Sequence, residues 1–190
     1  MKKPLKPKAC KSCGKEYMPR ATTQTACSAL CALNLIAKKK VVAADKQSKQ
    51  ERKADNEKRE ALKSRREVLN DAQRIFNKFI RLRDELQPCI SCGEHRNTYD
   101  AGHYRSVGAA PQLRFNEDNC HKQCVQCNQH KSGNAIEYRI GLVKRIGTGR
   151  VEALECSNQA VKWTAEDGRK IKAQYQDKIK QLRVQQGEKT

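Results

Sequence analysis

Apolar positions follow a helical pattern in two stretches of the chain. Between residues 62 and 86, Leu, Ile, Val and Phe recur close to the 3.6-residue period of a helix. A second stretch follows Thr164, and its apolar residues share one face of a predicted helix: Ile171, Tyr175, Ile179 and Leu182. The segment Thr164-Ala-Glu-Asp is typical of a helix start with a capping box. The pattern therefore predicts two helices that each bury one face.

The first of these stretches belongs to a longer segment, residues 37–86, that contains no Gly, Pro or Cys. We expect one long helix there, frayed or broken near residues 46–56, because most of its residues are good helix formers. Its first part, residues 38–59, is predicted to be a solvated charged surface. Its apolar second part is predicted to pack on the following module or on another subunit. The helix should end at Gln87-Pro88.

Composition limits the size of any core. Of the 190 residues, 37% are hydrophobic and 5% aromatic, which makes a single large core unlikely. The sequence has no run of about 18 apolar residues, as a membrane span requires, and no apolar signal segment at its start. We therefore expect a soluble, cytoplasmic protein that does not associate with membranes.

The net charge of the chain indicates the class of its partner. Forty Lys and Arg residues against 21 Asp and Glu leave a net charge of +19. An excess of this size favours a polyanion, with nucleic acid first and an anionic membrane surface second.

Nine of the ten cysteines form two clusters, which predict two zinc sites. In a reducing cytoplasm, Cys-x-x-Cys pairs indicate metal binding rather than disulfides. The predicted ligands of the first site are Cys10, Cys13, Cys27 and Cys31, and those of the second are Cys89, Cys92, Cys124 and Cys127. Cys120 could replace Cys124, but Cys124 and Cys127 repeat the two-residue gap. We expect Cys120 and Cys156 to be unligated thiols.

These features divide the chain into four predicted parts. Residues 1–36 form an N-terminal zinc module, with a knuckle, a short hairpin from Glu16 to Thr22 and a helix start that carries Cys27 and Cys31 on one turn. Residues 37–86 form the basic helical arm, residues 87–150 the zinc-bracketed core, and residues 151–190 a C-terminal segment with a helix.

The core contains a series of polar motifs between and after its cysteine pairs. They are Asp100-Ala-Gly-His103-Tyr, Leu113-Arg-Phe-Asn-Glu-Asp-Asn119 and Gln123-Cys-Val-Gln-Cys-Asn128. Over about 43 residues, Cys89 to Lys131, this order resembles the HNH (ββα-metal, His-Me finger) nucleases, in the Cys-Asn variant of the endonuclease VII type. Over a wider length the chain resembles the NinG/Rap recombination endonucleases of lambdoid phages.

The resemblance implies an α+β fold, a zinc-stapled ββα-metal core, and a metal-dependent DNA endonuclease that cleaves Holliday junctions and D-loops. If the chain is phage-encoded, it would act in the host cytoplasm. The imidazole of His103 is then the general base that activates water. Asn119 holds that ring in the correct tautomer, and Asn128 supplies an oxygen ligand to a catalytic Mg²⁺ or Mn²⁺.

The sequence departs from the family at the acidic metal ligand. The residue before the catalytic histidine is Gly102, so Asp100 is the expected ligand, with a bulge at Gly102 to bring it closer. Glu117 and Asp118 are the alternatives.

Three cations near the motifs are candidate phosphate clamps: Arg105, Arg114 and Lys131. We interpret His95, His121 and His130 as surface residues. Because a junction has two symmetry-related strands to cut, we expect a homodimer, formed through the apolar face of residues 76–86 or through the terminal helix.

Two other functions share much of this evidence. A non-catalytic zinc-finger protein that binds nucleic acid would have the same charge and zinc sites, but no need of His103 and Asn119. An HNH endonuclease acting on duplex DNA would share the catalytic residues and differ in substrate.

Overall fold

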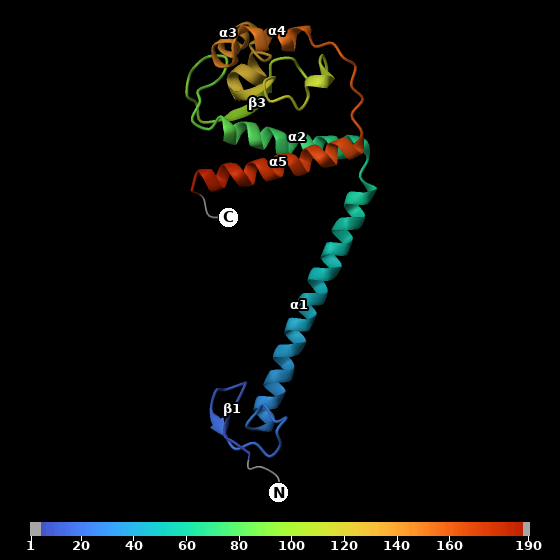
Figure 1. Cartoon of the computed structure of the whole chain (residues 1–190), viewed down its shortest axis with the longest axis vertical. Helices are drawn as coiled ribbons and strands as arrows, with labels where there is room; N and C mark the ends of the chain where they lie inside the picture. Colours follow the sequence, from blue (N-terminus) through green and yellow to red (C-terminus); the bar gives the residue numbers. More distant parts are fainter. Residues whose placement is uncertain (1–4, 188–190) are drawn as a thin grey trace. The chain divides into compact units, whose positions relative to one another are not determined.

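The computed structural model describes residues 5–187, so the ends of the first and last predicted parts lie outside the described residues. The chain divides into two compact units, Met1–Leu62 and Lys63–Thr190. The predicted boundaries lay after residues 36 and 86, so the basic segment is shared between the two units. The α+β class is confirmed, and most of the described structure is helical (Figure 1).

The first unit begins with two short antiparallel strands, β1 (Lys8–Ala9) and β2 (Glu16–Tyr17). Residues 10–15 connect them through a turn in which Gly14 has φ of 77°, a value that glycine adopts without steric cost. The predicted hairpin from Glu16 to Thr22 is therefore wrong, because Glu16–Tyr17 pairs back with Lys8–Ala9.

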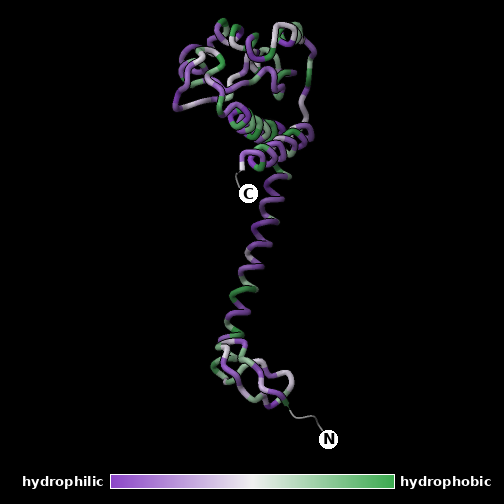
Figure 2. The backbone as a smooth tube through the Cα atoms, turned by 60° about the vertical axis from the view of Figure 1, so that its left-hand side comes forward, coloured by the Kyte–Doolittle hydropathy of each residue, from purple (hydrophilic) through white to green (hydrophobic). Residues whose placement is uncertain are grey.

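Helix α1 (Ala29–Leu62) follows and has no buried residue. Figure 2 shows it mostly in hydrophilic colours, with hydrophobic stretches near its beginning. The predicted break near residues 46–56 is wrong. The helix ends at Leu62, and α2 (Arg65–Arg83) starts after a capping box in which Ser64 and Glu67 satisfy each other's backbone N–H groups.

In the second unit, α2 lies beside the C-terminal helix α5 (Ala165–Gln185) (Figure 1). Thr164 and Asp167 form the predicted capping box of α5. The buried residues of the two helices share one core with the strand residues Ala101 and Cys120: Leu69, Ala72, Phe76, Phe79, Ile80, Tyr175 and Ile179. The predicted apolar faces are thus confirmed, but they bury each other. Leu86 and Val184 of these segments stay exposed, and the dimer that the sequence suggested stays a prediction.

The other elements of this unit surround an antiparallel strand pair. Strand β3 (Tyr99–His103) pairs with β4 (Cys120–Cys124) in unbroken register, from Tyr99 opposite Cys124 to His103 opposite Cys120. The predicted bulge at Gly102 is absent from this pair. A short 3-10 helix, η1 (Pro111–Leu113), lies in the connection between the strands.

After β4 the chain forms a π-helical turn, η2 (Gln126–His130), and helices α3 (Ala135–Ile146) and α4 (Thr148–Cys156). Buried residues of α3 and α4 make a second core with Ile90, Ala110 and Leu113. Among the described residues, no helix combines the length and the apolar character needed to cross a membrane.

Candidate metal centres and active-site pocket

The eight predicted zinc ligands form two four-cysteine clusters that could each hold a zinc ion. In each cluster all four sulfurs lie within 4.8 Å of one another. The distances are 3.6 Å from Cys13 to Cys27, 3.6 Å from Cys27 to Cys31 and 3.9 Å from Cys92 to Cys124. A tetrahedral ion with Zn–S bonds of about 2.3 Å requires an S···S distance of about 3.8 Å. Both donor sets therefore fit zinc in type and in spacing.

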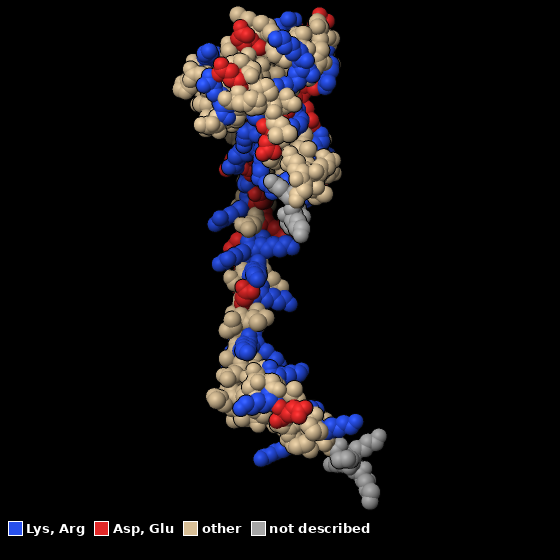
Figure 3. Space-filling view, turned by 90° about the vertical axis from the view of Figure 1, so that its left-hand side faces the viewer, with Lys and Arg blue, Asp and Glu red and all other residues tan. Residues whose placement is uncertain are grey.

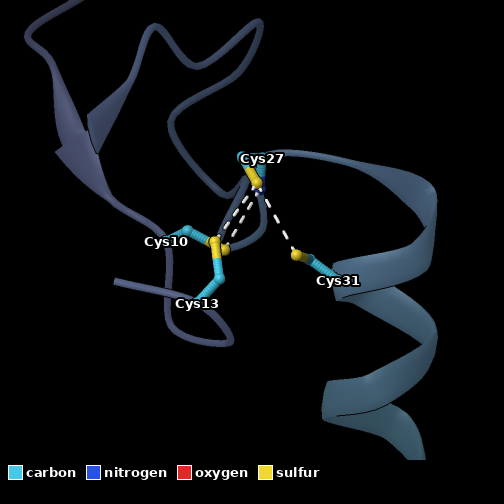
Figure 4. A group of neighbouring side chains, drawn as sticks. All are labelled: Cys10, Cys13, Cys27 and Cys31. Carbon is cyan, nitrogen blue, oxygen red and sulfur yellow. Dashed lines mark hydrogen bonds between the residues drawn. The ribbon is translucent and has the colours of Figure 1, made fainter. Parts of the chain in front are cut away.

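The first cluster joins the β1–β2 turn to the start of α1 (Figure 4). Cys10 and Cys13 lie on the turn, Cys27 lies just before the helix rather than on its first turn, and Cys31 lies within it. Backbone N–H groups of Cys13 and Cys27 lower the pKa of the Cys10 thiol to about 6. This favours the thiolate that a metal requires.

The second cluster ties the segment before β3 to the end of β4 and to η2. The N–H of Cys124 donates to Sγ of Cys89 (3.3 Å), and the N–H of Cys127 donates to Sγ of Cys124 (3.4 Å). Cys120 is not a member of this cluster, which confirms the preference for Cys124. An ion here would fix the position of η2 relative to the strand pair.

A polar pocket of about 390 Å³ lies between β3, the connection after it and η2. Its lining includes His103, Ser106, Asn128 and Ser132. Two residues predicted from the sequence for base and metal-ligand roles therefore share one pocket.

Asp100 and Asn128, the predicted pair of catalytic-metal ligands, are in direct contact. The side-chain amides of Asn128 and Gln129 each donate to Oδ2 of Asp100 at 2.8 Å. Carboxylate and amide oxygens are the donors that a hard divalent cation prefers. With its amide turned, Asn128 would present its oxygen beside the carboxylate. Asp100 and Asn128 are thus the residues that could hold Mg²⁺ or Mn²⁺.

The alternative acidic ligands are engaged elsewhere. Glu117 accepts hydrogen bonds from Tyr175 and Lys178 of α5, and Asp118 forms an ion pair with Arg150. None of the three carboxylates lines the pocket, but Asp100 contacts the lining residue Asn128.

His103 is held by a backbone carbonyl. Its Nε2 lies 3.0 Å from the carbonyl oxygen of Arg114. Since a carbonyl only accepts, Nε2 carries the hydrogen and Nδ1 is the basic nitrogen. Nδ1 lies 3.7 Å from Sγ of Cys120, a weak contact. Burial lowers the pKa of His103, so the ring is neutral at physiological pH and able to accept a proton.

Asn119 does not orient this ring, contrary to the expectation. Its side chain is fully buried, accepts from the N–H of Arg105 (2.9 Å) and donates to the carbonyls of Arg105 (2.9 Å) and Leu113 (3.3 Å). Asn119 therefore fixes the backbone just after β3, and the Arg114 carbonyl sets the tautomer of His103.

Two of the three predicted phosphate clamps have internal partners. The guanidinium of Arg105 donates to the carbonyls of Leu154, Glu155 and Ser157 at the end of α4. That of Arg114 donates to Gln73, Leu69 and Asn70 of α2. Lys131 is exposed beside the pocket residue Ser132. Of the three, it is the one still placed to meet a phosphate.

Sequence reasoning missed two features around the site. His121 is buried rather than on the surface, whereas His95 and His130 are exposed as predicted. Ser132, Gly133 and Asn134 form a run of positive φ angles (48°, 88° and 45°) that borders the pocket. Gly and Asn are enriched in such conformations, so the Ser-Gly-Asn sequence was an available signal.

Comparisons with known proteins identify the family. A family model described as Bacteriophage Lambda NinG protein matches residues 1–185. Protein ninG of Escherichia phage lambda is 55% identical over 113 residues, which cover 59% of this chain and 55% of that protein. For protein ninG of Salmonella phage P22 the identity is 54% over 113 residues, covering 59% of this chain and 56% of that protein.

The chain spans about half the length of the curated relatives it matches. No solved structure matches it. Because the family model covers nearly all of the sequence, this chain belongs to the NinG family of lambdoid phages.

Proposed function

We propose that this chain is a metal-dependent DNA endonuclease with an HNH-type ββα-metal site, and that it cleaves branched recombination intermediates such as Holliday junctions and D-loops. The observation that carries the proposal is a pocket lined by His103, whose basic nitrogen is defined by the Arg114 carbonyl, and by Asn128, whose amide contacts Asp100. The net charge of +19 suits a DNA substrate.

In this mechanism each residue has one task. His103 takes a proton from the attacking water at Nδ1, which gives up its weak contact with Sγ of Cys120, while its Nε2–H stays on the Arg114 carbonyl. Asp100 and Asn128 would hold a divalent cation, which would supply Lewis-acid stabilisation of the phosphate and of the leaving oxygen. Asn119 and the second zinc cluster hold the backbone on either side of the pocket. The preference for branched DNA rests on the resemblance to recombination endonucleases.

The test replaces His103 with Gln and measures cleavage of a labelled four-way junction beside a linear duplex of the same sequence. Loss of a general base should slow cleavage by about 10²–10⁴-fold, with DNA binding retained. His95→Gln, a change at an exposed histidine, is the matched control and should cleave normally.

Two outcomes would contradict the proposal. If the chain is a non-catalytic DNA-binding protein, neither the unmodified chain nor His103→Gln should cleave DNA. The contacts of both ring nitrogens of His103 would also suit such a protein. An endonuclease for duplex DNA predicts equal cleavage of the two substrates.

A further inference from the structure

Basic residues are concentrated at the beginning of the chain. The first 40 residues contain ten Lys and Arg and one acidic residue, Glu16, for a net charge of +9 out of the total of +19. Eight of these cations lie among the described residues, and all eight are exposed: Lys6, Lys8, Lys11, Lys15, Arg20, Lys38, Lys39 and Lys40. Figure 3 shows Lys and Arg side chains projecting from this unit.

None of these eight cations forms an ion pair within residues 5–187. The lysines farther along α1 differ, because Lys49 pairs with Asp45 (2.8 Å) and Lys53 with Glu57 (3.9 Å). The single helix therefore carries one group of lysines whose charge is not balanced locally and another whose charge is partly balanced.

A hollow of about 710 Å³ lies next to the first cysteine cluster, with Cys27 in its wall. Tyr17 and Gln24 line it, but they donate to the carbonyls of Gln24 and Ala26. Four of its other lining side chains can donate hydrogen bonds: Arg20, Thr23, Thr25 and Ser28. These are the residue types that contact phosphate and sugar oxygens in protein–DNA interfaces.

The candidate active site, by contrast, has little free positive charge. Arg105 and Arg114 are committed to backbone carbonyls of α4 and α2, which leaves Lys131 from the predicted set. Lys131 alone would neutralise one phosphate beside the pocket, whereas a DNA-binding protein normally neutralises several.

We infer that the N-terminal unit is a second DNA contact, separate from the cleavage pocket, that holds the phosphodiester backbone through Lys38, Lys39, Lys40 and Arg20 without reading base sequence. Like charge on all eight cations disfavours a second copy of this chain as the occupant. The inference shares with the proposed function the premise that DNA is the partner, but it does not require that His103 cleaves it.

The test compares two triple variants of the full chain. One carries Lys38→Gln, Lys39→Gln and Lys40→Gln, and the matched control carries Lys49→Gln, Lys53→Gln and Lys58→Gln on the same helix. Binding to a fluorescent four-way junction and to a duplex is measured by anisotropy from 50 to 200 mM NaCl. Each phosphate contact contributes about 0.9 to the slope of log K against log salt concentration. The first variant should therefore reduce the magnitude of this slope by about 2–3, and the control should reduce it by less than 1.

Further measurements separate the possible failures. Circular dichroism and zinc content should match those of the unmodified chain in both variants. At limiting protein the Lys38–Lys40 variant should cleave more slowly, in proportion to its weaker binding, whereas His103→Gln should keep the full salt slope and lose cleavage. Equal slopes in the two triple variants would overturn the inference, as would binding of this unit to phosphatidylglycerol vesicles with no change in DNA affinity.

Discussion

The guanidinium of Arg105 shows how a charged side chain can serve the fold. Three backbone carbonyls at the end of α4 accept its hydrogen bonds, while Asn119 holds both the N–H and the carbonyl of the same residue. Arg105 thus connects the segment after β3 to α4. Hydrogen bonds to charged groups contribute about 1.5–3 kcal/mol each to stability. The charge of Arg105 therefore stabilises the fold.

His121 should make the stability of the second unit depend on pH. Burial, followed by the nearby charge of Arg83, lowers its pKa to about 4, although Asp84 and Asp118 oppose this shift and Arg145 adds to it. The unfolded chain binds the proton near pH 6.5, so stability present above that pH is lost as the pH falls toward 4. Between pH 7 and pH 5 the free energy of unfolding should fall by roughly 2 kcal/mol from this residue alone.

Urea unfolding at the two pH values, with excess zinc present, measures this loss. His121→Gln keeps a polar side chain without a titration in this range, so its stability should depend less on pH. His95→Gln, at an exposed position, should behave like the unmodified chain. An unchanged pH dependence in His121→Gln would refute the prediction.

At the scale of elements, the junction between α1 and α2 rests on the side chains of Ser64 and Glu67. Ser64 Oγ accepts from the N–H of Glu67, and the Glu67 carboxylate accepts from the N–H of Ser64. Replacing Ser64 with Ala should lower the stability of the second unit by about 1 kcal/mol. Ser48→Ala, inside α1, removes no cap and should cost nothing. Chemical denaturation followed by circular dichroism distinguishes the two, and equal effects would contradict the role of the cap.

Local sequence signals predicted the elements well and their contacts less well. The cysteine spacing indicated both clusters, and the apolar period indicated the buried faces of α2 and α5. The break between α1 and α2 was available in the pattern Ser64-x-x-Glu67, but the absence of Gly and Pro obscured it. A helix boundary set by two capping side chains needs no helix-breaking residue.

The sequence predicted which residues belong to the candidate site, but not which partners they contact. His103, Asp100 and Asn128 were identified from their order. His103 and Asn128 line one pocket, and the carboxylate of Asp100 accepts from the Asn128 amide. The hydrogen-bond partner of His103 could not be identified from the sequence, because every residue has a backbone carbonyl and the residue type does not mark this one. The roles of Arg105 and Asn119 depend on the connection between the strands, which local patterns do not specify.

At the scale of the whole molecule, the two units should respond separately to loss of zinc. Among the described residues of the first unit, the buried hydrophobic residues are Cys10 and Ala26, so the fold around its cluster depends on the ion. We expect two zinc ions per chain. Cys10→Ser should leave one ion and unfold the region around residues 8–27, without shifting the thermal transition of the second unit.

Zinc released to a colorimetric chelator gives the stoichiometry, and calorimetry gives the transitions. Cys92→Ser is the counterpart, because it should remove the other ion and destabilise the second unit. A shift of the second unit's transition in Cys10→Ser would mean that the two units are coupled. A homodimer stays a prediction.

Adjacency of Cys127 and Asn128 on the single turn η2 affects how inhibition by EDTA must be interpreted. A reagent that strips zinc would release the turn that carries the proposed magnesium ligand, so it would abolish the proposed hydrolysis whether or not magnesium takes part. Restoring Mg²⁺ alone, Zn²⁺ alone, or both to the stripped protein separates the two requirements, and recovery should need both.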